Sequence, residues 1–175
     1  MNWTELLNAE TESVYAVTEK LMSRVDESVL AWKPATGSNW MTTGQLLRHL
    51  AESCGASFRA FIKGDWGLPE GVDINNLPPE QMLPPAENMP AVASVVEAIQ
   101  LLLKDKQLAF EVLRSCSEEE LATKPTPAPW DPMGMVLGQR LLQMIDHTKQ
   151  HKGQLFYYLK LQGKSVNTVD LWGAQ

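Results

Sequence analysis

Apolar residues recur three or four positions apart in four long stretches of the chain, which is the spacing of an amphipathic helix. These stretches cover about residues 3–25, 42–63, 90–116 and 135–162. In the last stretch the apolar positions follow a four-three alternation that is typical of bundle packing. These positions, which we call the apolar seam of the last helix, are Leu137, Leu141, Met144, Thr148, His151, Leu155 and Tyr158. The pattern therefore predicts four long helices that pack together through their apolar faces.

Capping residues mark where helices should begin and end. A serine, threonine or asparagine followed three residues later by glutamate or glutamine is a helix-start signal, because each side chain binds a free backbone N–H of the first turn. The pairs are Asn2 with Glu5, Thr42 with Gln45, and Ser117 with Glu120. Gly64 and Gly163 follow the second and the last stretch, where glycine commonly ends a helix. We expect a short additional helical segment after Ser117.

Two connections are rich in proline. The first, residues 64–88, has no helical or strand pattern, and we expect it to form a crossover or a lid over a site. Pro90, which a first helical turn tolerates, is predicted to open the third helix. Four prolines between residues 125 and 132 are expected to exclude regular structure there. The predicted fold class is all-α: one four-helix-bundle domain over residues 1–175, with a long crossover loop between helices two and three.

The charge of the chain disfavours nucleic acid as a partner. The formal net charge is −6, from 21 acidic and 15 basic residues, whereas a duplex-binding protein needs a concentrated basic face. Four lysines do gather late in the chain, and we interpret them as the solvated side of the last helix. They are Lys149, Lys152, Lys160 and Lys164.

The cysteines and the apolar segments bear on the compartment. Cys54 and Cys116 are too few for a disulfide framework and do not form a CxxC pair, so we expect a reducing, cytoplasmic location. No secretion signal is predicted, because the N-terminal residues lack a basic region followed by an apolar one. No membrane span is predicted, because the most apolar stretch, residues 92–103, is interrupted by Glu97 and Gln100.

All three histidines of the chain occupy positions that can face one interior site. His147 and His151 are four residues apart in the last stretch, so their side chains point to one side of the helix. His151 takes a position in the apolar seam, and His49 flanks the apolar face of the second helix beside small residues. The constellation predicts one divalent metal ion held by three imidazoles. The alternative is three separate histidines, each bonded to a carbonyl or to water.

Two polar residues are candidates for supporting roles. Glu52 follows His49 by three residues and Gln154 follows His151 by three, so each shares the side of its helix with a histidine. Either is expected to orient a ligand or to assist proton transfer, and solvation at the surface is an equal alternative for both. Asp146 points about 100° away from His147 and is a poor candidate.

Other residues have both a functional and a packing interpretation. Trp40, Trp66 and Trp130 flank the helices, either at the rim of a substrate pocket or, as we favour, as packing anchors for the loops. Cys54 is predicted to be a buried core residue rather than a nucleophile. Glu10 falls within the apolar stripe of the first helix, and we interpret it as an edge residue in water rather than a paired carboxylate.

The histidine-bearing segments resemble a known family. The stretch HTKQHKGQL at 147–155, followed by Tyr158-Leu159 and Gly163, is similar to the last-helix signature of the DinB/YfiT-like superfamily. The HLAE segment at 49–52 resembles the other half. The resemblance covers the helix order and nearly the whole chain, although only these two stretches are sequence-specific. Lys152 stands where arginine is more frequent in the family, a departure that leaves the ligands unchanged.

This resemblance implies a metal-dependent protein. It assigns nickel, zinc or another divalent ion to His49, His147 and His151, with a low-molecular-weight thiol or water at an open coordination position. Members of the superfamily include thiol-dependent S-transferases, a mycothiol-dependent isomerase and proteins with no assigned reaction. Thiol transfer to a small-molecule substrate is therefore the leading hypothesis for this chain. Metal-dependent hydrolysis and a non-catalytic, stress-related metal-binding role are the alternatives.

The identity of the metal and the oligomeric state are less defined. Imidazole ligands suit zinc, nickel, iron or copper, and the resemblance favours zinc or nickel ahead of iron or manganese. A homodimer is expected, because relatives are often dimers and a helix face can keep apolar surface.

Overall fold

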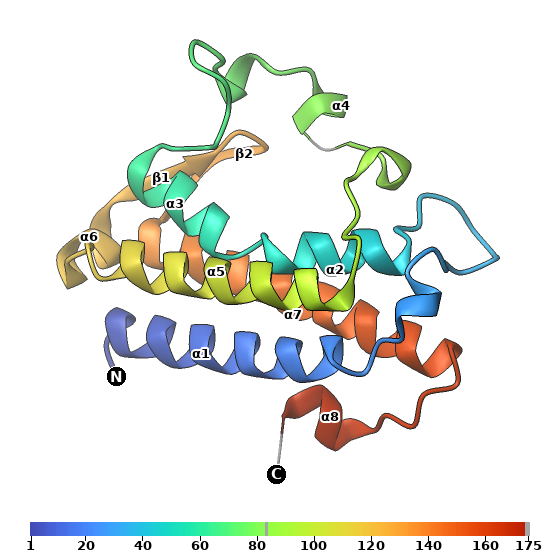
Figure 1. The fold of residues 1–175 in the computed structure, drawn as a ribbon. Helices are drawn as coiled ribbons and strands as arrows, with labels where there is room; N and C mark the ends of the chain where they lie inside the picture. The colour runs from blue at the N-terminus through green and yellow to red at the C-terminus, as the bar shows by residue number, and fades with distance from the viewer. Residues whose placement is uncertain (83, 174–175) are drawn as a thin grey trace.

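Five helices form the body of the molecule in a computed structural model that describes residues 1–82 and 84–173 (Figure 1). They are α1 (Trp3–Met22), α2 (Thr43–Ala51), α3 (Gly55–Lys63), α5 (Val95–Leu113) and α7 (Leu137–Leu161). Both α2 and α3 pack on α5 and α7, so together they take the place of one helix. The body is a four-helix bundle, and the predicted all-α class is confirmed.

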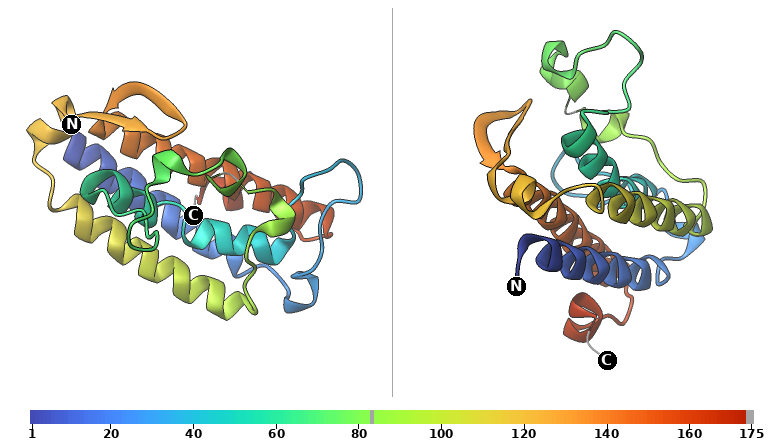
Figure 2. Two further views of the ribbon diagram at one scale, coloured as in Figure 1. Left: turned by 90° about the horizontal axis from the view of Figure 1, so that it is seen from above. Right: turned by 90° about the vertical axis from the view of Figure 1, so that its left-hand side faces the viewer.

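Shorter elements cover two sides of this bundle. They are α4 (Pro79–Met82), α6 (Glu118–Thr123), α8 (Thr168–Trp172) and 3₁₀ helices at Glu27–Val29, Ile74–Asn76 and Ala86–Asn88. The crossover at 64–88 therefore contains short helical turns that its sequence pattern did not predict. This crossover rises above α3, whereas α8 packs against α1 and α7 on the opposite side (Figure 2).

The capping signals of the sequence are confirmed. Asn2, Thr42 and Ser117 each accept a hydrogen bond from the backbone three residues on, and each forms a complete capping box. Gly163 follows α7 with a φ of 81°, the left-handed conformation that favours glycine. Most predicted helix ends therefore lie within a few residues of the observed ones.

The prediction of one continuous second helix is wrong. The chain leaves α2 at Glu52 and enters α3 at Gly55. The buried carboxylate of Asp105, from α5, accepts hydrogen bonds of 2.8 Å from the backbone N–H groups of both Gly55 and Ala56. It thereby caps the first turn of α3, as an N-cap side chain does within one helix. Tyr15 of α1 also donates to this carboxylate, at 2.6 Å, so the break is held from two neighbouring helices.

The third helix begins at Val95 rather than at Pro90. Ser94 caps it by accepting a hydrogen bond from the backbone three residues on. Just before the helix, the backbone N–H of Val92 donates to the carbonyl of Gly44 at 3.2 Å. Because α2 supplies this acceptor, the N–H group of Val92 is paired without a helical hydrogen bond. The segment before Val95 therefore does not need to be helical.

A β-hairpin occupies the segment where no strand was predicted. Strand β1 (Pro125–Ala128) pairs antiparallel with β2 (Asp131–Val136). The side chains of Thr126 and Ala128 are buried, and those of Pro125 and Pro127 are exposed. Prolines are compatible with this hairpin because each strand has only one neighbour and needs N–H donors on one edge alone.

The prediction that the late lysines all lie on the solvated side of the last helix is wrong. Lys152 is only 8% exposed, and its Nζ donates to the carbonyl of Leu171 in α8 at 2.7 Å. Lys149 forms an ion pair with Glu10. Glu10 is therefore a paired, half-buried carboxylate rather than an edge residue in water. Lys152 is covered by α8, which was not predicted, and the pair of Lys149 with Glu10 joins α7 directly to α1.

Aliphatic and aromatic side chains fill the interior between the helices. Among those with no exposed surface are Leu46, Leu47, Leu50, Phe58 and Leu141. Cys54 belongs to the same core, as predicted, and burial raises the pKa of its thiol, which disfavours a nucleophilic role. In the described part of the chain, no helix combines the length and the apolar character needed to cross a membrane.

Candidate metal centre

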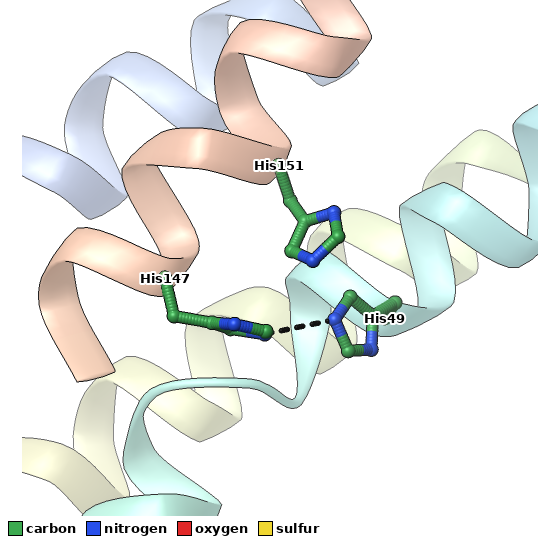
Figure 3. A group of neighbouring side chains, drawn as sticks. All are labelled: His49, His147 and His151. Atoms are coloured by element: carbon green, nitrogen blue, oxygen red, sulfur yellow. Dashed lines mark hydrogen bonds between the residues drawn. The ribbon is translucent and has the colours of Figure 1, made fainter. Parts of the chain in front are cut away.

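The three histidines converge where α2 faces α7 (Figure 3). His49 lies in the last turn of α2, and His147 and His151 lie one turn apart on α7. The Nε2 atoms of His49 and His147 are 3.0 Å apart. One ring nitrogen of each histidine lies within 4.8 Å of the other two. The structure thus brings together all three residues that the sequence predicted as ligands.

Small polar residues hold the two helices at the distance that this convergence requires. Ser53, in the break between α2 and α3, lies with its Oγ 3.0 Å from Oγ1 of Thr148 on α7. Thr148 also lies 3.1 Å from the carbonyl oxygen of Met144. Both hydroxyl side chains are buried. Because Thr148 follows His147 directly, this contact fixes the helix break against the turn that carries a candidate ligand.

Burial keeps the three imidazoles neutral. Loss of hydration, followed by the proximity of His151 and His147, lowers the pKa of His49 to about 3. Loss of hydration, followed by the proximity of His151, lowers the pKa of His147 to about 4. Burial also lowers the pKa of His151. All three rings are therefore neutral at pH 7, which is the form of histidine that binds metal ions.

The donor set fits a divalent cation. Two neutral rings present the same ring nitrogen, Nε2, to each other at hydrogen-bond distance, and the third ring completes the cluster. A cation placed among them can accept a lone pair from each of the three rings. Without a cation, an N–H group of one ring can bind the lone pair of only one other ring. Three protein ligands also leave a coordination position for a further molecule, as in catalytic rather than structural zinc sites.

A cavity of about 690 Å³ opens beside the cluster. Its lining includes His49 and His147, so the candidate metal site faces it directly. The apolar part of the wall comes from four separate segments and includes Met82, Met89, Trp130 and Met144. Arg48, Glu52 and Asp146 are its charged residues. A cavity of this size and mixed lining is typical of small-molecule sites.

The two predicted supporting residues have different neighbours. Gln154 is in contact with a candidate ligand, because its Oε1 lies 2.9 Å from Nδ1 of His151. Glu52 lines the cavity, but its carboxylate accepts a hydrogen bond of 2.6 Å from Nε of Arg48. Asp146, which the helix geometry had marked as a poor candidate, is exposed and also borders the cavity. Of the two predicted supporting residues, Glu52 and Gln154, only Gln154 is placed to orient a histidine.

Of the three tryptophans considered as rim residues, Trp130 lines the cavity. Its ring lies 6.0 Å from that of Trp66, and both contact the ring of Phe61, at 6.1 and 5.1 Å. Trp40 packs elsewhere, with its ring 6.3 Å from that of Tyr158. The tryptophans are packing anchors, as we favoured, and Trp130 is in addition part of the cavity wall.

Sequence reasoning missed Arg140, which fixes this wall. Its side chain is completely buried. Nε donates to the carbonyl of Thr126 in β1 at 3.1 Å, and a second nitrogen donates to Asp131 at the start of β2 at 3.0 Å. A third nitrogen donates to Gln143, which lines the cavity, at 2.6 Å. The hairpin that carries Trp130 is thus attached to α7 through one guanidinium. An arginine directly before a seam leucine was the available sequence signal.

Replacing Arg140 with alanine is expected to destabilise the protein by about 2–3 kcal/mol, because buried acceptors lose charged donors and a cavity is left. Urea denaturation measures this change as a shift in the transition midpoint. Arg114→Ala is the matched control, since Arg114 is exposed and should change stability by less than about 0.5 kcal/mol. Equal stabilities of the two variants would contradict the role given to Arg140.

The fold and the site together define a class: a four-helix bundle with a three-histidine site for a divalent metal ion at the edge of a cavity. The sequence profile of the DinB superfamily matches residues 10–155, which include all three histidines, the whole of α2, α3 and α5, and most of α1 and α7. The chain belongs to the DinB superfamily. Among curated proteins, none matches it.

Proposed function

We propose that this protein is a divalent-metal-dependent enzyme that transfers a low-molecular-weight thiol to a small organic electrophile. The observation that carries the proposal is the position of the histidines: two of the three clustered imidazoles, those of His49 and His147, line a 690 Å³ cavity, so the cluster is not enclosed in the core. A purely structural ion needs no such space. Membership in the DinB superfamily supports a metal-dependent role.

His49, His147 and His151 would hold the ion. When bound, a divalent cation supplies the positive charge that stabilises a thiolate near neutral pH. The neutral rings add no charge of their own and keep their lone pairs available. In the transfer, the sulfur forms a bond to carbon and the electrons of the broken bond go to the displaced atom, which is a departing halide or the ring oxygen of an epoxide. The thiol proton passes to solvent, and an opened epoxide oxygen takes up a proton from solvent.

The remaining lining residues would bind and orient the two reactants. Trp130, Met82, Met89 and Met144 offer an apolar, polarisable wall for the electrophile. The guanidinium of Arg48 lines the cavity and is suited to bind a carboxylate of the thiol. Nε of Arg48 donates to the carboxylate of Glu52 at 2.6 Å, which orients the guanidinium. Placing both reactants beside one wall is expected to accelerate their reaction by proximity.

Hydrolysis is the second candidate, and a specific observation favours it. The carboxylates of Glu52 and Asp146 border the same cavity as the histidines. A carboxylate there can act as a general base towards a water molecule that attacks a bound ester. Hydrolysis differs from transfer in needing no thiol.

A panel of thiols and electrophiles tests these alternatives. Glutathione, cysteine and bacillithiol would each be paired with an epoxide and an activated aryl halide, with zinc- or nickel-loaded protein and with chelator. We expect thiol consumption at least tenfold above the protein-free rate, abolished by the chelator. Ester cleavage without thiol would favour hydrolysis. Protein-free rates throughout would leave a non-catalytic metal-binding role.

A further inference from the structure

A chain of three hydrogen bonds runs outward from His151. Its Nδ1 lies 2.9 Å from Oε1 of Gln154. Nε2 of Gln154 donates to the hydroxyl of Tyr158 at 3.1 Å, and this hydroxyl donates to the carbonyl of Met41 at 2.9 Å. Three of these residues follow one side of α7, because they are spaced by three and four positions.

The carbonyl at the end gives this chain a direction. A backbone carbonyl only accepts, so Tyr158 must use its one proton on Met41. The oxygen of Tyr158 can then only accept from Gln154, which must present its NH₂ group there. The amide carbonyl of Gln154 consequently faces His151, and since a carbonyl cannot donate, the proton of the imidazole must be on Nδ1.

We propose that Gln154 and Tyr158 are positioning residues that hold His151 in the Nδ1–H tautomer, so that its Nε2 lone pair is free for the metal ion. This inference rests on the metal site of the proposed function. In Figure 3 one ring nitrogen of His151 points towards the other two rings and the other points away from them. The opposite tautomer would put a proton, not a lone pair, at the site.

Burial strengthens the hold of these hydrogen bonds on the tautomer of His151. Tyr158 is 2% exposed and Met41 is 7% exposed, so water cannot readily replace either hydrogen-bond partner. The ring of Trp32 packs edge-on against Tyr158 with 5.2 Å between centroids, which further fixes the phenol. With these partners fixed, reversing the amide of Gln154 would set two acceptors, its own carbonyl oxygen and the phenol oxygen, against each other.

The chain also connects the two halves of the site. Met41 directly precedes Thr42, the residue that caps α2. Its carbonyl therefore belongs to the start of the helix that carries His49, whereas Tyr158 and His151 belong to α7. One buried hydrogen bond thus sets the tautomer of a candidate ligand on α7 and ties α7 to the helix that supplies another.

The tautomer can be measured without any metal. In metal-free protein labelled with ¹⁵N-histidine, long-range ¹H–¹⁵N spectra distinguish the protonated from the unprotonated ring nitrogen. We expect His151 to carry its proton on Nδ1 in the wild type. Tyr158→Phe removes the donor to Met41 and lets the amide of Gln154 turn, so a mixture of both tautomers is expected. Tyr157→Phe is the matched control, because Tyr157 is the adjacent residue and is 65% exposed.

Metal affinity provides the second readout. Zinc competition with a chelating dye should show a loss of about tenfold for Tyr158→Phe, as for other outer-shell partners, and no loss for Tyr157→Phe. Adding Gln154→Glu to Tyr158→Phe should restore both the Nδ1–H tautomer and the affinity, since both carboxylate oxygens accept and the direction of the chain no longer matters. Gln154→Met alone should lose both.

Two results would overturn the inference: an Nε2–H tautomer in the metal-free wild type, or a Tyr158→Phe variant that folds and keeps the wild-type tautomer. If Tyr158→Phe does not fold, the Gln154→Glu and Gln154→Met pair decides, because only the first keeps an acceptor beside Nδ1. A protein with the expected tautomer but without zinc affinity would contradict the proposed function instead.

Discussion

Replacing His147 with alanine is expected to reduce bound divalent metal from about one ion per chain to none after dialysis, and to abolish the metal-dependent reaction. His147 is one of only three imidazoles in the cluster, and its Nε2 lies 3.0 Å from that of His49. Loss of a direct ligand should weaken affinity by more than the roughly 100-fold upper value for outer-shell partners. Elemental analysis and zinc competition measure the effect.

Gln150→Ala is the matched control for this variant. Gln150 is an exposed residue of the same helix, between the two candidate ligands, and it borders the same cavity. It should retain the wild-type metal content. Equal metal content in His147→Ala and Gln150→Ala would place the bound ion elsewhere on the chain.

The second large effect is expected at Gly55, where α3 approaches α5. A Cβ atom on this residue would lie 2.1 Å from the backbone carbonyl oxygen of Asp105. Because backbone rather than a flexible side chain is in the way, Gly55→Ala must separate the two helices and weaken the cap that Asp105 gives to α3. We expect a loss of about 3 kcal/mol or more, as for severe overpacking, measured by urea denaturation.

Gly153 provides the control for this substitution. It lies inside α7, and a Cβ atom there would have no heavy atom within 4 Å. Gly153→Ala is expected to be neutral or to stabilise by about 0.5–1 kcal/mol, because alanine favours the helix over the unfolded chain. If Gly55→Ala were as stable as Gly153→Ala, the tight contact between α3 and α5 would be contradicted.

The features that the sequence predicted best are local. Capping boxes such as that of Thr42 with Gln45 are formed within four residues, so their geometry is written in adjacent positions. The convergence of the histidines was also predictable, because His147 and His151 share one side of a helix and His49 borders an apolar face. A helical face that must be buried leaves little freedom in where its side chains point.

The features that it missed depend on distant partners. The break before Gly55 is stabilised by Asp105, which lies in another helix and has no periodic signal of its own. The hairpin needs Arg140, whose guanidinium binds both strands from α7. The burial of Lys152 depends on α8, a helix of five residues. In each case tertiary contacts override local propensity.

The supporting residues of the site show the same limit. Spacing alone placed Glu52 and Gln154 in equivalent positions relative to their histidines. The structure separates them, because Glu52 is engaged by Arg48 and Gln154 by His151. The role of Tyr158 could not be inferred from the sequence, since it depends on the carbonyl of Met41, far away in the chain.

The most direct test of the central claim is a crystal structure of the purified protein, with anomalous diffraction recorded at the absorption edges of zinc and nickel. We predict one anomalous peak per chain, bounded by ring nitrogens of His49, His147 and His151 at about 2.0–2.1 Å. A peak held by other residues, or the ring of His49 turned away from an ion on α7, would contradict the account.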